Sequence, residues 1–366
     1  MYCEIDQDRL ISAIESKDKD AIINAIDLGA VLKIDEDDIC WSKYPLIAAV
    51  QTGDLEIISL LLDLGADVNA HPERSDLTAL YFASKSQCCP ETVKLLISAG
   101  VNLNVRYLNS TLIAHLCYFY DNREIKCLNN KQYEILQLFL EHGVDTKTTG
   151  KDDPNSLFQS AIESNDIRTV KLLLTHKVKS TQARTYDAAC EAASKGSYEV
   201  LKLLLEHKFK PTPKKNKGHI GQGVLQSAIY GGHKNIVRLL LEYGATIEEP
   251  THPSGDYYPA NVYTAAKVNS KEIMKLLLEA GSNPDGGVRQ KPLIDIHPLT
   301  LAVMNHNSDI VEMLIQYGAN TSPVDYFLIE GEEINYSKKT PLDISIEKEF
   351  SNITEILIAN GAQSAE

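Results

Sequence analysis

The sequence lacks any uninterrupted run of apolar residues long enough to cross a membrane. Runs such as Ile57–Leu62 and Leu239–Leu241 soon end at charged residues, whereas a membrane-spanning helix needs about 18 apolar residues or more. The first ten residues carry acids where a secretory signal would have bases followed by an apolar stretch. We therefore expect a soluble protein without a Sec-type export signal.

Regularly spaced cysteines are also missing. The seven cysteines are an odd number scattered over 366 residues, and no Cys-x-x-Cys or His-x-x-x-His pair is present to begin a zinc site. This pattern argues against a disulfide framework and favours a reducing compartment. Phosphate-binding glycine motifs and the Gly-x-Ser-x-Gly signature of hydrolases are absent too. We therefore expect no metal, no cofactor and no catalytic residues, and we interpret the chain as a non-enzyme.

Positive charge is scarce, because 36 Lys and Arg face 50 Asp and Glu for a net charge of −14. Half of this excess lies in the first 40 residues, where eleven acidic residues face four basic ones. Such a field repels nucleic acid and anionic membranes and attracts basic partners. One basic cluster, Lys208–Lys217, is compatible with an acidic partner or with nucleic acid, but the overall charge disfavours nucleic acid.

One repeated phrase dominates what is present: a Leu-rich amphipathic stretch that ends in Gly-Ala or an equivalent pair, as in Ile57–Asn69 and Ile310–Asn320. Glycine at the helix-ending position suits a left-handed C-terminal cap. Where Lys replaces it, either the side chain costs about 1 kcal/mol in that conformation or the chain turns differently. The position recurs ten times, at spacings of 31 to 43 residues: Gly29, Gly65, Gly100, Gly143, Lys177, Lys208, Gly244, Gly281, Gly318 and Gly361.

A shorter helix is predicted before each of these stretches. Three of these helices open with proline, at Pro45, Pro298 and Pro341, and proline is favoured at the first helical position. Neither helix can bury its apolar side alone, so neighbouring copies must stack into a solenoid with a continuous core. We therefore predict a single all-α domain over residues 1–366, built from ten stacked helix-turn-helix units.

These units resemble the ankyrin repeat, whose hallmark is a unit of about 33 residues with a Thr-Pro-Leu-His-x-Ala opening. The openings Tyr44–Ala49, His297–Ala302 and Thr340–Ser345 are similar, although another residue replaces the His in each. The resemblance covers about residues 8–363, and repeat four, Ser110–Thr146, carries about ten extra residues near Phe119–Gln132. It implies hairpin-like loops along one edge and first helices that line a concave groove.

Several of the predicted loops are long, and long loops in a compact fold are more often functional than accidental. They are Val31–Lys43, Pro211–Gln222, Glu248–Pro259, Asn283–Ile296 and Ser322–Lys339.

Three histidines, His142, His176 and His207, each precede the helix-ending position of successive repeats. A metal-binding ladder is one interpretation. We favour the other, in which a His at a helix C-terminus interacts with the helix dipole.

The resemblance implies protein binding, and two sets of residues are candidates for contacting the partner. The first set is aromatic residues outside the apolar stripes, because Trp and Tyr are frequent interface hot spots. The second set follows the small residue pair of each first helix, a position that faces the groove in this family. The candidates are Trp41, Tyr44, Tyr107, Tyr257, Tyr258 and Tyr326 in the first set, and Gln51, Lys85, Tyr118, Glu163, Lys195, Tyr230, Lys267 and Met304 in the second.

We predict a non-catalytic module that binds a partner protein, with a basic partner favoured by the acidic N-terminal part. Its concrete form would be neutralisation, as when an immunity protein blocks a toxin. One alternative is a bacterial effector that engages a host protein, and another is an enzyme whose site lies in the long loops or the repeat-four insertion. We expect a monomer in the cytoplasm of the producing cell or, for an effector, of a host cell.

Overall fold

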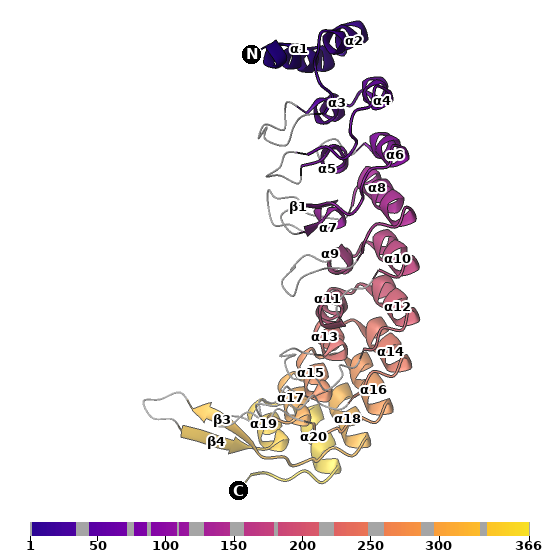
Figure 1. The fold of residues 1–366 in the computed structure, drawn as a ribbon. Coiled ribbons are helices and arrows are strands. Elements are labelled where there is room, and N and C mark those ends of the chain that lie inside the picture. The colour runs from indigo at the N-terminus through magenta and orange to yellow at the C-terminus, as the bar shows by residue number, and fades with distance from the viewer. Residues whose placement is uncertain are drawn as a thin grey trace. The chain divides into compact units, whose positions relative to one another are not determined.

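The computed structural model describes residues 2–33, 44–71, 77–85, 89–107, 110–116, 128–146, 157–178, 182–211, 223–247, 260–286, 296–329 and 335–365. The chain divides into two compact units, Met1–Ser180 and Thr181–Glu366. In each unit the helices come in pairs, with the first helices in one layer and the second helices in the other (Figure 1). The predicted all-α class and the stacking of two-helix units are confirmed. The prediction of one domain over residues 1–366 stays a prediction.

Unit 1 holds the first five pairs and one short hairpin. The first helices α1, α3, α5 and α7 contact one another in order, as do the second helices α4, α6 and α8. The pairs are α1 (Tyr2–Ser16) with α2 (Lys19–Asp27), α3 (Pro45–Thr52) with α4 (Leu55–Asp63), α5 (Ala79–Lys85) with α6 (Pro90–Ser98), α7 (Leu112–Leu116) with α8 (Asn130–Glu141), and α9 (Leu157–Glu163) with α10 (Ile167–Thr175). Strands β1 (Arg106–Tyr107) and β2 (Ser110–Thr111) form the hairpin.

Unit 2 holds the other five pairs and a longer hairpin. Its first helices stack in the order α11, α13, α15, α17, α19, and its second helices in the order α12, α14, α16, α18, α20. The pairs are α11 (Gln182–Lys195) with α12 (Tyr198–Glu206), α13 (Val224–Tyr230) with α14 (Lys234–Glu242), α15 (Asn261–Lys267) with α16 (Lys271–Glu279), α17 (Pro298–Met304) with α18 (Ser308–Gln316), and α19 (Pro341–Glu347) with α20 (Ser351–Ala359).

Side chains at the helix starts explain why the pairs form where they do. Pro45, Pro298 and Pro341 each open a first helix, as predicted. Several second helices begin at a polar N-cap. For example, Asp54 accepts the backbone N–H groups of Glu56 and Ile57, at 3.0 and 3.3 Å. A cap of this kind contributes about 1 kcal/mol, so the turn between the two helices of a pair is set locally.

Each helix buries its apolar stripe against the neighbouring pairs. In α4, for example, Ile57, Ile58 and Leu61 are at most 1% exposed. Burial of such a side chain contributes about 1.5–3 kcal/mol. The leucines that define the repeat therefore hold the stack together.

All ten helix-ending positions adopt a positive φ, including Lys177 at 55° and Lys208 at 69°. The prediction of a left-handed cap is therefore confirmed at the eight glycines, and of the two alternatives for Lys177 and Lys208 the left-handed conformation is the one observed. A second left-handed position, between the two helices of a pair, was not predicted. Its occupants are Lys17, Gly53, Asn165, Gly196, Gly232, Asn269, His306 and Glu349, with φ between 54° and 85°.

Lys177→Gly and Lys208→Gly are each expected to raise the free energy of unfolding by about 0.5–1 kcal/mol. Glycine removes the strain of a left-handed side chain but adds some entropy to the unfolded chain. Lys171→Gly, the same change inside α10, should instead lower this free energy by about 1 kcal/mol. Urea denaturation followed by circular dichroism measures all three. Equal destabilisation by the three changes would contradict the assignment.

Polar side chains tie the loops after several second helices to the next repeat. Asn69 Oδ1 accepts the backbone N–H of Asn102 at 2.6 Å, and Asn104 Oδ1 accepts that of Asp145 at 2.7 Å. In unit 2, Asp285 accepts the N–H of Asn320 at 2.9 Å. We call these bonds the loop rungs. They satisfy backbone donors that would otherwise depend on water and fix the spacing of neighbouring loops.

The last of the long predicted loops forms an antiparallel hairpin that extends away from the helices (Figure 1). Its strands are β3 (Asp325–Ile329) and β4 (Asn335–Lys339). Asp325 is fully buried and accepts the backbone N–H of His297 at 3.1 Å. The Nδ1 of His297 lies 2.7 Å from the same carboxylate. The hairpin is therefore anchored to the start of α17.

Other loop segments fall partly or wholly outside the described residues. For the predicted insertion near Phe119–Gln132, residues 119–127 lie outside them, whereas Asn130–Gln132 belong to α8. Helix α8 is 12 residues long, while α4, α6 and α10 have nine each.

Candidate functional site

The first helices of unit 2 present one large exposed side chain per repeat. Helices α13, α15 and α17 each end at their seventh residue, which is Tyr230, Lys267 and Met304 respectively. Tyr230 is 56% exposed and Met304 45%, and Lys267 is exposed too. With the corresponding last residues of α11 and α19, Lys195 and Glu347, they form what we call the first-helix row.

The band around this row is narrow. One turn earlier on α13 and α17, Gln226 and Thr300 are 3% and 0% exposed, and the equivalent Tyr263 on α15 is half-buried. The row therefore offers a strip about one side chain wide, not a broad helix face.

Two hydrogen bonds hold neighbouring members of the row side by side. The side-chain amide of Asn305 donates to the carbonyl oxygen of Ala266 at 2.9 Å, next to Lys267 and Met304. Likewise His233 Nε2 lies 2.9 Å from the carbonyl oxygen of Ser194, which precedes Lys195. Both bonds join the end of one first helix to the next repeat, so the row has a fixed register.

Charges within the row differ in how they are neutralised. Lys195 forms an ion pair with Glu191 on its own helix at 2.5 Å, and Glu347 pairs with Lys339 of the hairpin. Lys267 forms no ion pair with any residue that the structure describes. Within this described part, the row thus presents one free cation between a tyrosine and a methionine.

The remaining predicted contact residues are less exposed or lie elsewhere. Tyr44 is 3% exposed, so its ring packs within unit 1. Gln51 and Glu163, in α3 and α9, are half-buried. For Lys85, Tyr107 and Tyr326 only the backbone is placed, in α5, β1 and β3, and Trp41, Tyr118, Tyr257 and Tyr258 lie outside the described residues.

Acidic side chains gather on α1, α2 and the turn between them. Two nearby lysines already have acidic partners, because Lys17 lies 3.8 Å from Asp54 and Lys19 pairs with Glu56. The exposed acids that form no ion pair or hydrogen bond with any described residue are Asp8, Glu15, Asp20 and Asp27. We call these four residues the acidic N-terminal surface.

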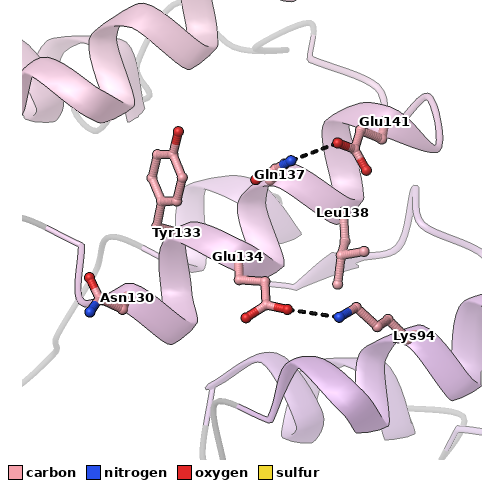
Figure 2. A pocket seen from close by; sticks show the side chains of 7 residues that line it. All are labelled: Lys94, Asn130, Tyr133, Glu134, Gln137, Leu138 and Glu141. Carbon is pink, nitrogen blue, oxygen red and sulfur yellow. Dashed lines mark hydrogen bonds and ion pairs between the residues drawn. The ribbon is translucent and has the colours of Figure 1, made fainter.

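A groove of about 530 Å³ lies on the second-helix side of unit 1, between α6 and α8 (Figure 2). Its polar groups are already paired, since Lys94 lies 2.8 Å from Glu134 and Gln137 donates to Glu141 at 2.8 Å. Asn130, from the extra turn of α8, also lines it and accepts from Arg168 at 3.0 Å. The sequence did not suggest this groove, because nothing in the repeat pattern marks it.

The three histidines lie at helix C-termini, as favoured in the sequence. His142, His176 and His207 are the C-cap residues of α8, α10 and α12. The Nδ1 atoms of His142 and His207 lie 2.8 Å from the carbonyl oxygens of Leu138 and Leu203. Within the described part of the chain, no three potential metal ligands come together.

Cys190, on α11, has little nucleophilic character. Burial raises the pKa of its thiol to about 12, which keeps it protonated at neutral pH. Burial likewise raises the pKa of the nearby Tyr186 hydroxyl, whose oxygen accepts the backbone N–H of Val224 at 3.3 Å. Both side chains therefore serve packing between α11 and α13.

Where the structure describes the chain, no helix combines the length and the apolar character needed to span a bilayer.

Comparison with known proteins gives matches along nearly the whole chain. A putative ankyrin repeat protein of Rickettsia bellii is 25% identical over 334 residues, which are 88% of this chain and 76% of that protein. Ankyrin repeat and KH domain-containing proteins of Caenorhabditis briggsae and Caenorhabditis elegans are each 26% identical over 75% and 76% of this chain. The chain spans only 10% and 11% of the length of these two nematode proteins.

A family model described as ankyrin repeats (3 copies) matches residues 10–107, 125–215, 160–251, 190–287 and 262–365. These matches overlap and leave few residues uncovered. They agree with the helix pairs and the left-handed caps of the structure. The chain therefore belongs to the ankyrin repeat family.

Proposed function

We propose that this protein binds a partner protein through the first-helix row and the loops beside it. Ankyrin repeats are generally protein–protein interaction modules and are typically non-catalytic. The observation that carries the proposal is the exposure of Tyr230 and Met304, at 56% and 45%, on helices whose other apolar side chains are mostly buried. Large exposed side chains of this kind are common anchors at interfaces.

The charge of the chain supports a basic partner. The acidic N-terminal surface carries four exposed carboxylates without a neutralising base among the described residues. Such a surface accelerates the encounter with a positively charged protein, and salt screens the attraction. Trp41, Tyr257 and Tyr258, which lie outside the described residues, stay predicted partner contacts. The proposal is limited to binding, because no observation favours neutralisation over recruitment.

Tyr230→Ala with Met304→Ala is expected to weaken capture of the natural partner by about tenfold or more, since loss of two anchors removes at least about 1.4 kcal/mol. Affinity purification of the tagged full chain from its source cells, with quantitative mass spectrometry, measures this. Tyr243→Ala with Tyr317→Ala is the matched control, because both tyrosines are 43% exposed but lie at the ends of second helices.

The same captured partner is expected to be basic and to be released as salt rises from about 50 to about 500 mM. A partner that is lost equally from both double variants, or kept by both, would refute the role of the first-helix row.

A further inference from the structure

Lys267 is the cation of the first-helix row that no described residue neutralises, and its two neighbours in the row are Tyr230 and Met304. The other two charges of the row, at Lys195 and Glu347, are taken up by Glu191 and Lys339. The ammonium group of Lys267 can therefore form an ion pair with a carboxylate of a partner. The apolar parts of Tyr230 and Met304 flank it on both sides.

The spacing of the row limits the form of the ligand. Packed helices lie about 8–10 Å apart, so successive members of the row are separated by about that distance. An extended chain in the polyproline II conformation has three residues per turn and rises about 3.1 Å per residue, so side chains three residues apart lie on the same edge, roughly 9 Å apart, one over each member. Because the residues one turn earlier are buried on α13 and α17 and Tyr263 on α15 is half-buried, the strip suits the single row of side chains on one edge of such a peptide. An α-helix, about 10 Å wide, would need contacts on both sides of the strip.

We propose that the first-helix row of unit 2 recognises an extended segment of a partner protein, in the polyproline II conformation, in which an Asp or Glu is flanked on each side, about three residues away, by an apolar residue. The carboxylate pairs with Lys267, and the apolar side chains contact Tyr230 and Met304. This inference rests on the proposed function, since it names the segment that the row would bind. A partner that is basic overall can still carry this acidic segment, because the acidic N-terminal surface belongs to unit 1 and the row belongs to unit 2.

Selection of a random phage-displayed peptide library on the full-length protein tests the proposal. Wild-type protein is expected to enrich peptides with an acidic residue about three positions from each of two apolar residues. Lys267→Glu should reverse the central preference from acidic to basic, and Lys267→Gln should abolish it. The control is Lys234→Glu, an exposed lysine at the start of α14 without an ion pair among the described residues, and its selected peptides should match those of wild type.

The affinity of the best selected peptide, measured by fluorescence anisotropy, should fall about tenfold with Lys267→Glu and remain unchanged with Lys234→Glu. Circular dichroism confirms that each variant is folded. The proposal is overturned if no peptide is enriched, if the enriched peptides lack the central acid, or if Lys267→Glu leaves the selection unchanged. Each of these results would leave the proposed function open to its own test, since binding of the natural partner would still depend on Tyr230 and Met304 if that function is right. Failure of the peptide proposal and failure of the proposed function can therefore be told apart.

Discussion

Gly231→Ala is expected to lower the free energy of unfolding by about 3 kcal/mol, the upper part of the range for an overpacked site. A Cβ at Gly231 would collide with the carbonyl oxygen of Ser194 and lie 2.6 Å from Cδ2 of His233. A backbone oxygen cannot move aside as the end of a flexible side chain can. Relief would therefore require breaking the 2.9 Å bond between His233 and Ser194. Chemical denaturation monitored by circular dichroism measures the loss.

Gly232→Ala is the control, because Gly232 lies in the same turn but a Cβ added there would meet no atom of a non-neighbouring residue within 4 Å. Its φ of 74° should make alanine cost only about 1–2 kcal/mol. The decisive result is a larger loss of unfolding free energy for Gly231→Ala than for Gly232→Ala. Because Gly231 has an ordinary helical φ of −72°, equal losses at both positions would show that the contact with Ser194 and His233 costs no more than the left-handed strain at Gly232, and would contradict the prediction.

The ring of His233 also explains Gly196, in the preceding repeat. A Cβ there would lie 2.7 Å from Cε1 of His233, so the imidazole occupies space that two glycines leave open. Together, Gly196, Gly231 and His233 allow α13 to pack closely against α11. Because this set also fixes the end of α13, it supports the position of Tyr230 in the first-helix row.

Asp325→Ala is expected to lower the free energy of unfolding by about 2–3 kcal/mol and to loosen the β3–β4 hairpin. The change removes a fully buried carboxylate and leaves the backbone N–H of His297 without its acceptor, and an unsatisfied buried donor costs about 1–3 kcal/mol. Amide hydrogen exchange is the sharper measurement, because it resolves local opening. Faster exchange is expected in β3, in β4 and in the first turn of α17.

His297→Ala should have a smaller effect, since it deletes the 2.7 Å contact of Nδ1 with Asp325 but keeps the backbone donor. Unchanged exchange of the hairpin amides in Asp325→Ala would show that other contacts hold the hairpin in place.

The repeat pattern predicts the local features of this fold well. Leucine spacing, prolines at the first helical position and glycines at the cap each act within a few residues, and the positive φ of Lys177 and Lys208 follows from their place in the pattern. Asn165 and Asn269 share a second left-handed position with residues as different as Glu349. That position was missed because no single residue type marks it.

Contacts between distant segments could not be read from the sequence. His297 and Asp325 are 28 residues apart, in different repeats, and nothing local distinguishes this aspartate from the many on the surface. The loop rungs left a weak signal, the recurrence of Asn, Asp or Ser two and four residues after the cap glycine, as at Asp67 and Asn69. For the candidate site, the positions in the row were predicted, but the different charge environments of Lys195 and Lys267 depend on rotamers and neighbours.

The loop rungs have a mechanical consequence. Each one joins a loop only to the loop of the adjacent repeat, as Asn69 joins Asn102 and Asp285 joins Asn320. Stability in such arrays is shared between nearest neighbours. Under tension a terminal repeat would therefore peel away while the repeats behind it kept their bonds, and the chain would lengthen in small successive steps and shorten again when the load was released.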